Sequence, residues 1–148
     1  MKSCFLFGHS DTPEEVRQRI EAAVERLYRE QDVRLFYVGG YGAFDRLAAS
    51  AVKSVKGKIP EVELYFVTPY HPTERPCELP PGFDGIFYPP LENVPRQYAI
   101  VRANRYMIAT SDAIICYVWH GASNTQKLLE YARRREKKEG IHIENLIS

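Results

Sequence analysis

The sequence predicts an α/β domain of the Rossmann-like class: three layers, α/β/α, around a parallel sheet of about five strands. The 148-residue chain has the length of one domain. Short apolar runs alternate along it with longer amphipathic runs. The apolar runs are nearly continuous, which is typical of parallel strands buried on both faces and joined by helical crossovers.

The expected elements follow in a regular order. Strands are predicted where apolar residues run together, at 3–8, 34–40, 62–70, 112–121 and 141–147. Helices are predicted where apolar residues recur at helical spacing, at 12–30, 44–55, 96–111 and 123–140. Thr12 with Glu15, and Ser123 with Gln126, have the spacing of capping boxes, and Gly140 is typical of a helix end.

One segment interrupts the alternation. Residues 69–95 hold eight of the ten prolines and show no clear periodicity. A loop of this length inside a compact domain is typical of a lid or a binding loop, and a stiff surface excursion is equally compatible. We therefore interpret 1–148 as a single domain with a proline-rich lid or loop at 69–95.

Composition limits the classes of function. The net charge of +1 argues against broad, charge-driven binding of nucleic acid. No apolar run approaches the roughly 20 residues that span a bilayer, and the N-terminus turns polar too early for a signal peptide, so we expect a cytoplasmic protein. Three widely spaced cysteines form no CxxC pair, which disfavours structural zinc.

Most candidate site residues follow the predicted strands. In parallel sheets of this class, ligands bind beyond the carboxyl ends of the strands. The segments at those ends are GHSD (8–11), GGYGAFD (39–45), TPYHP (68–72) and WHGASN (119–124). The opposite edge carries plain connections. This asymmetry predicts a small-molecule site at the carboxyl edge.

The glycine-rich junction after the second strand raises a question of charge. Gly39, Gly40 and Gly42 allow close backbone approach, and free N–H groups at a helix start can receive an anion. Asp45 would repel that anion. It can instead accept hydrogen bonds from a ribose or a base, or simply favour the helix dipole. The junction matches neither a Walker loop nor GxGxxG.

The helix predicted at 96–111 carries unusual polar residues. Asn104 falls in its apolar stripe, where an amide needs hydrogen-bond partners. Arg102 and Arg105 share another face, which points either to the site or to solvent. His9, His71 and His120 follow three different strands, but no carboxylate–histidine spacing accompanies them, so no metal site is expected.

Four motifs resemble a known family. They are FGHSDTP (7–13), FYVGGYGAFDRLA (36–48), RANRYMIATSDAIICYV (102–118) and GASNTQKLLEYARRR (121–135). Together they resemble the SLOG (SMF/DprA–LOG) superfamily, in order and over almost the whole chain. The chain looks most similar to small stand-alone SLOG proteins of bacteria and their phages, close to the YpsA-like branch.

The resemblance implies a Rossmann-like fold that binds nucleotides or nucleotide-derived molecules such as ADP-ribose, and it implies a homodimer. The ligand positions implied by motif matching are Gly8, His9, Ser10, Gly39, Gly40, Gly42, Asp45, and the GASN turn with Gly121, Ser123 and Asn124. Residues added from their own positions are Tyr70 and Trp119 for base stacking and Arg102, Asn104 and Arg105 for polar contacts.

One departure separates the chain from the LOG enzymes, which release a base from a nucleotide. Their PGGxGTxxE motif corresponds here to VGGYGAFDR, with Ala43 and Arg46 at the Thr and Glu positions. We therefore expect a module that senses or sequesters a nucleotide derivative, without a cofactor. The alternative is an enzyme acting on an N-glycosidic bond, similar to a phosphoribohydrolase or deoxyribosyltransferase, with Asp45 or Glu130 as catalytic candidates. Nucleic-acid binding, as in the DprA branch, is ranked last.

Overall fold

The strand order fixes where a site can form in this protein. The structure is a computed structural model that describes residues 1–91, 93–121 and 123–147. Within these ranges, six strands form one parallel sheet in the order β4-β3-β2-β1-β5-β6. The elements are β1 (Lys2–Gly8), α1 (Val16–Gln31), β2 (Val33–Val38), α2 (Ala43–Lys58), β3 (Glu63–Val67), β4 (Gly85–Phe87), η1 (Arg96–Tyr98), α3 (Ala99–Thr110), β5 (Ala113–Tyr117), α4 (Asn124–Glu139) and β6 (His142–Asn145).

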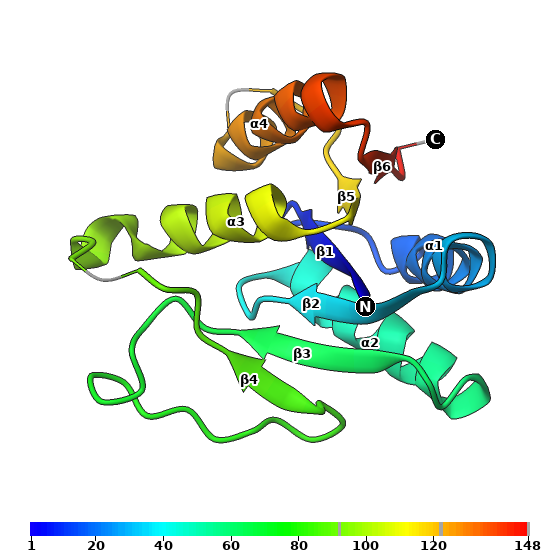
Figure 1. Cartoon of the computed structure of the whole chain (residues 1–148), viewed down its shortest axis with the longest axis horizontal. Helices are drawn as coiled ribbons and strands as arrows, with labels where there is room; N and C mark the ends of the chain where they lie inside the picture. Colours follow the sequence, from blue (N-terminus) through cyan, green and yellow to red (C-terminus); the bar gives the residue numbers. More distant parts are fainter. Residues whose placement is uncertain (92, 122, 148) are drawn as a thin grey trace.

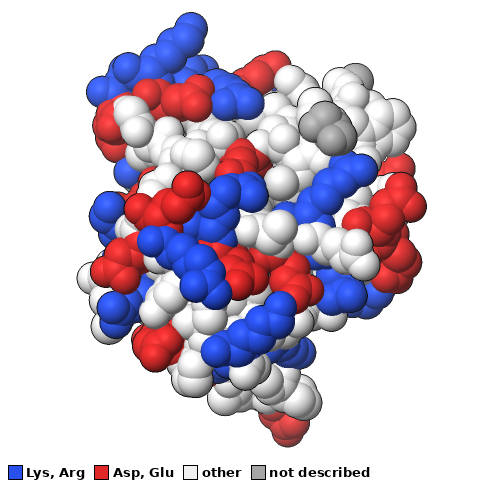
Figure 2. Space-filling model, turned by 90° about the vertical axis from the view of Figure 1, so that its right-hand side faces the viewer, with Lys and Arg blue, Asp and Glu red and all other residues white. Residues whose placement is uncertain are grey.

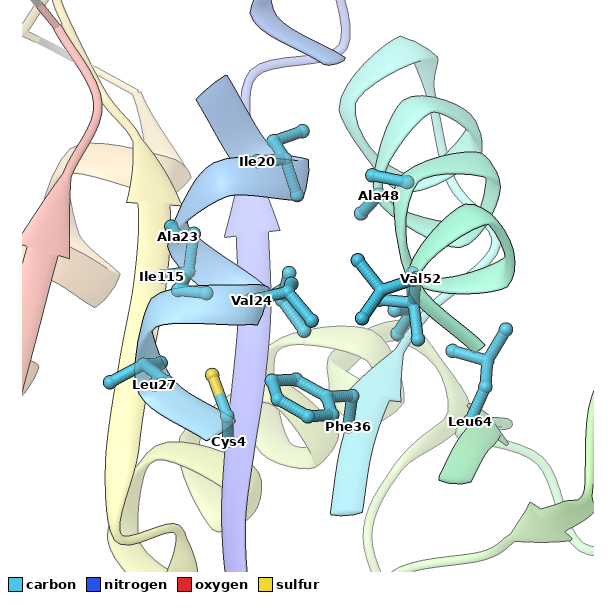
Figure 3. Packing of buried hydrophobic residues seen from close by; sticks show 14 of the residues in the cluster. Cys4, Ile20, Ala23, Val24, Leu27, Phe36, Ala48, Val52, Leu64 and Ile115 are labelled. Atoms are coloured by element: carbon cyan, nitrogen blue, oxygen red, sulfur yellow. The ribbon is translucent and has the colours of Figure 1, made fainter. Parts of the chain in front are cut away.

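Helices cover both faces of the sheet (Figure 1). On one face, α1 and α2 pack against each other and on the central strands, with Ile20 and Val24 directed toward Val52 and Phe36 (Figure 3). On the other face, α3 and α4 pack together over a second cluster that includes Phe5 and the buried part of β5. Burial of each large apolar side chain contributes roughly 1.5–3 kcal/mol. The predicted class, Rossmann-like and three-layered, is confirmed.

One strand more than expected, β4, lies in the proline-rich segment, where the sequence predicted no regular structure. β4 extends the sheet beside β3. Its three residues are too few to show a period. The Asp84 carboxylate holds it in place, accepting hydrogen bonds from the Leu64 N–H (2.7 Å) and the Lys56 ammonium (2.5 Å). Burial would raise the pKa of Asp84, but these two partners outweigh it and lower the pKa.

Of the two helix caps predicted from the sequence, the structure has the one at α4 and lacks the one at α1. The Ser123 hydroxyl accepts a hydrogen bond from the Gln126 N–H at 3.2 Å, and Gly140 ends α4 with a left-handed backbone, as predicted. The capping box of Thr12 and Glu15 is wrong. Thr12 instead donates its hydroxyl to the His9 carbonyl, which closes the turn after β1, and α1 begins at Val16. No helix in the described ranges is long and apolar enough to cross a membrane.

The turn before α2 is packed against the turn after β1. Gly42 has φ +114°, a backbone conformation that residues with a side chain rarely adopt. A Cβ there would lie 2.8 Å from Ser10 Cα. The Ala43 N–H donates to the Ser10 carbonyl at 3.1 Å. Gly42 is therefore required for the close approach of two loops at the carboxyl edge.

We predict that Gly42→Ala lowers the free energy of unfolding by about 2–4 kcal/mol, because backbone strain adds to the contact with Ser10. Gly57→Ala is the matched control. A Cβ at Gly57, inside α2, meets nothing within 4 Å, so this change should stabilise the protein by roughly 0.5–1 kcal/mol. Urea unfolding of both variants measures the difference. Equal effects would contradict the close approach of the two loops.

Candidate functional site

The site forms where the strand order reverses direction. The chain runs from β1 outward to β4 on one side, then crosses to β5 and β6 on the other, so the switch point lies between β1 and β5. A crevice opens at such a point beyond the carboxyl ends of the strands. The two ends are joined here: the His9 N–H donates to the Tyr117 carbonyl at 3.3 Å.

A cavity of about 200 Å³ occupies this crevice. Its floor is formed by Phe5, Phe7 and Gly8 of β1, and α3 and α4 close one side. The other lining residues are Ser10, Gly39, Tyr41, Asp45, Val67, Pro69, Ile100, Val101, Ala103, Asn104, Asn124, Thr125 and Leu128. The walls are therefore mainly apolar, with a few polar groups from the strand ends and helix starts.

The Asp45 carboxylate stabilises the glycine-rich loop through a hydrogen bond to its backbone. The carboxylate accepts a hydrogen bond from the Tyr41 N–H at 2.9 Å and lies 3.2 Å from where a Gly39 Cβ would be. Burial raises the pKa of Asp45 from 3.8 to about 6, although the Tyr41 N–H acts in the opposite direction. The carboxylate therefore closes the loop on itself and holds Tyr41 at the surface, which accounts for an acidic residue beside three glycines.

His9 and His120 form a stacked pair beside the cavity. Their rings lie 3.7 Å apart between centroids and nearly parallel, and the Asp11 carboxylate lies 3.9 Å from His120 Nε2. The ligand atoms of these three residues lie within 4.8 Å of one another. His71 lies elsewhere, against Thr73 and Tyr88. The structure thus brings together two of the three histidines considered from the sequence, with Asp11 in place of the third.

The hydrogen bonds of His9 do not suit a metal ligand. The Trp119 N–H donates to His9 Nε2 at 3.2 Å, so the proton of neutral His9 is on Nδ1. Metal-ligating histidines usually donate their second nitrogen to an oxygen, which is the opposite arrangement. Burial, together with the neighbouring His120, lowers the pKa of His9 and favours this neutral form. His9 thus helps to hold the turn after β1 against the turn after β5.

Exposed aromatic rings gather at the same edge. Among the described residues, the aromatic side chains that remain exposed are Tyr41 after β2, Tyr98 before α3 and Trp119 after β5, at 46%, 54% and 56%. All three elements end or begin at the carboxyl edge of the sheet, and Trp119 packs edge-on against His120. Of the three, Tyr41 lines the cavity. The other Phe and Tyr side chains of the described residues are at least partly buried.

The structure brings six of the predicted ligand residues into the cavity wall. They are Gly8, Ser10, Gly39, Asp45, Asn104 and Asn124. Gly40, Gly42 and Ser123 shape the adjacent turns: a Cβ at Gly40 would lie 2.8 Å from the Phe66 ring, and Ser123 caps α4. Gly121 is exposed in the turn after β5, and Ala122 of the GASN turn lies outside the described residues.

Other predicted residues lie away from the cavity. Arg105 stacks over Tyr131 of α4, with 4.9 Å from guanidinium to ring centroid, and Arg102 is exposed on α3. Tyr70 lines a neighbouring groove. Glu130 lines a separate surface depression on α4, so the two catalytic candidates, Asp45 and Glu130, do not meet.

Sequence reasoning missed the apolar wall of the cavity and Tyr41. Phe5, Phe7 and Leu128 have the periodicity of ordinary core residues, so no local signal sets them apart. Tyr41 could have been found, because a large ring between glycines at a strand end has little core to enter.

Comparison with known proteins gives the fold and no sequence family. No family model matches the chain, and no curated protein matches it. Its fold is similar to that of DNA processing protein A from Helicobacter pylori, in a structure that concerns the single-stranded DNA binding mode of that protein, with a TM-score of 0.60. The match has 14% identity and covers 96% of this chain but 63% of that one. At this identity the likeness shows the fold alone, which is Rossmann-like.

This finding corrects the function expected from the sequence. We expected a binder of ADP-ribose-like molecules and disfavoured nucleic acid as a partner, yet the protein that shares the fold binds single-stranded DNA. The cavity agrees with the correction. Its volume of about 200 Å³ is below the roughly 300–1,000 Å³ of sites that enclose drug-sized ligands. Nucleic-acid binding was ranked last because of the net charge of the chain. Net charge does not reveal exposed aromatic rings on which bases can stack.

We predict that Asp45→Asn stabilises the protein at pH 7.5 and not at pH 4. Because the pKa is raised in the folded state, ionisation of Asp45 does not destabilise the protein below about pH 4. The destabilisation grows as pH rises from about 4 to about 6, and it is complete above that. An amide oxygen still accepts from the Tyr41 N–H but carries no charge. The expected gain is about 1–3 kcal/mol at pH 7.5, several degrees in Tm.

Thermal unfolding of the wild type and Asp45→Asn at both pH values tests this prediction. A loss of stability at pH 7.5 would show that the loop requires the charge of Asp45, and would contradict the account.

Proposed function

We propose that this chain binds single-stranded DNA along the carboxyl edge of its sheet. The observation that carries the proposal is the gathering of Tyr41, Tyr98 and Trp119 at that edge, as the exposed aromatic rings of the described residues. Proteins that bind single strands stack successive bases on such rings, which contributes roughly 1–3 kcal/mol per base. The fold shared with a single-stranded DNA-binding protein supports the same reading.

The polar groups of the crevice suit the sugar–phosphate backbone. The N-terminus of α4 has free N–H groups at the same edge, and Asn124 and Thr125 at this helix start line the cavity. The Asn104 side chain makes no hydrogen bond to the described residues and lines the cavity, so its amide is available to a base edge or a phosphate. The partly buried Asp45 is engaged with the loop, which lessens its repulsion of a phosphate.

The charge distribution on another face favours this edge by contrast. Figure 2 views the molecule from the side where, in Figure 1, the amino ends of the strands lie, and Lys and Arg alternate there with Asp and Glu. Ion pairs such as Arg26–Glu144 occupy some of these charges. Mixed charges attract a polyanion weakly. The face in Figure 2 is therefore a poor surface for a polyanion.

Finer assignments belong to the same proposal. Placement near the YpsA-like branch of the SLOG superfamily rests on the motifs quoted above. The homo-oligomer and the lid role of residues 69–95 stay predictions as well. DNA processing protein A is longer than this chain, so nothing beyond single-strand binding is transferred from it.

We predict that a ten-residue oligothymidylate quenches the fluorescence of Trp119, the single tryptophan of the chain, at low ionic strength. Tyr41→Ala should weaken binding roughly 5- to 100-fold, because one stacking platform is lost. Tyr41→Phe keeps the ring and is the matched control, so it should bind within about twofold of the wild type.

A hairpin duplex of the same length is the second control, since its paired bases cannot stack on protein rings. The proposal fails if millimolar oligothymidylate changes neither Trp119 emission nor the anisotropy of a labelled strand. It also fails if the duplex binds as tightly as the single strand.

A further inference from the structure

A second hollow adjoins the cavity, on the proline-rich segment. This groove has a volume of about 920 Å³ and is lined by residues of the segment and by the start of η1 and α3. Pro69 lines both the cavity and the groove, so the two are neighbours on the surface. In Figure 1 the segment extends from the end of β3, on the side where α3 begins.

Two arginines converge on one tyrosine at this groove. The Arg75 guanidinium lies 4.3 Å and the Arg96 guanidinium 5.7 Å from the centroid of the Tyr70 ring. A turn closed by the Arg75 N–H to the His71 carbonyl, at 3.0 Å, folds Arg75 back over the ring. Neither arginine forms an ion pair within the described residues. Two like charges on one ring repel each other, and a phosphate beside them would relieve the repulsion.

The groove is aromatic as well as basic. The His71 ring packs edge-on against Tyr88, at 5.2 Å between centroids. His71 Nδ1 accepts from the Thr73 N–H at 3.1 Å, which leaves Nε2 as the donor of the neutral ring. Glu74 also lines the groove and opposes an anion on its own side. The cations are therefore confined to the part around Tyr70.

Tyr41 connects this cluster to the cavity. Burial raises the pKa of Tyr41, and the Tyr70 phenol adds to the rise, while the Arg75 charge lowers it. Tyr41 lines the cavity together with Pro69, the residue that precedes Tyr70 in the chain. A strand stacked on Tyr41 at the cavity therefore has the Tyr70 cluster as its next contact.

We infer that Tyr70, Arg75 and Arg96 form a second subsite for the single strand, in which the two guanidinium groups held over the Tyr70 ring bind successive phosphates. The inference rests on the function proposed above and extends it. A strand of about four nucleotides covers the exposed edge beside the cavity alone, whereas a longer strand also reaches the groove. The prolines at 69, 72 and 76 stiffen the segment, so little ordering opposes binding.

The test compares labelled oligothymidylates of four and ten residues by fluorescence anisotropy. The wild type should bind the longer strand at least tenfold more tightly. The double variant Arg75→Ala/Arg96→Ala should leave the affinity for the short strand within twofold and lower that for the long strand at least fivefold. Its salt slope for the long strand should fall by about 1 to 1.5, because two phosphate contacts are lost.

The matched control is Arg29→Ala/Arg134→Ala, which removes the same charge from α1 and α4 and should change neither affinity. If Arg75→Ala/Arg96→Ala lowers the affinity for both strands equally, or for neither, the subsite is wrong while the proposed function stands. If no strand binds the wild type, the proposed function fails and the subsite with it.

A chemical probe tests the subsite without any substitution. Cys77 is partly exposed in the segment, and its thiol influences the pKa of Tyr41. Cys4 and Cys116 are buried, and burial raises the pKa of Cys4 well above its usual value and that of Cys116 to about 12. A thiol-alkylating reagent should therefore react with Cys77 much faster than with Cys4 or Cys116, so the rate of alkylation reports the accessibility of Cys77. The ten-residue strand should slow it several-fold and the four-residue strand should not; equal rates with both strands would overturn the subsite.

Discussion

The pairing of β1 with both β2 and β5 is the constraint on which the rest of the structure depends. Cys4 to Phe7 are buried on both faces, so β1 takes the centre of the sheet and the chain must reverse direction beside it. The reversal opens the crevice between the ends of β1 and β5. Gly8, with its Cβ position 2.5 Å from the Phe44 ring, and Gly42 against Ser10 draw α2 close enough to form one wall.

Around this crevice, charge and aromatic surface are divided between two regions. The cavity has apolar walls and the amide side chains of Asn104 and Asn124, while the cations lie around Tyr70 at the groove. A single strand has both kinds of surface, bases and phosphates, along one contour. The arrangement therefore fits a linear ligand better than an enclosed small molecule, and it explains how a chain of net charge +1 can still bind an anion.

The sequence predicted the fold well because continuous apolar runs and amphipathic helices are local signals. It also indicated candidate ligand residues, of which Gly8, Ser10, Asp45 and Asn104 line the cavity, and the role of this edge as a binding site stays a prediction. It missed β4, whose three residues are held by the distant Lys56 and Leu64 contacts of Asp84. It ranked nucleic acid last on net charge, in which the convergence of Arg75 and Arg96 on Tyr70, a tertiary feature, is invisible.

The most direct test is a ¹H–¹⁵N correlation spectrum of the protein titrated with a ten-residue oligothymidylate. The account predicts shifts at the turns after β1, β2 and β5, and at Tyr70 and its neighbours. It predicts none in α1 or at the amino ends of the strands. Shifts confined to those distant elements, or an unchanged spectrum at millimolar strand, would contradict binding of single-stranded DNA at the carboxyl edge.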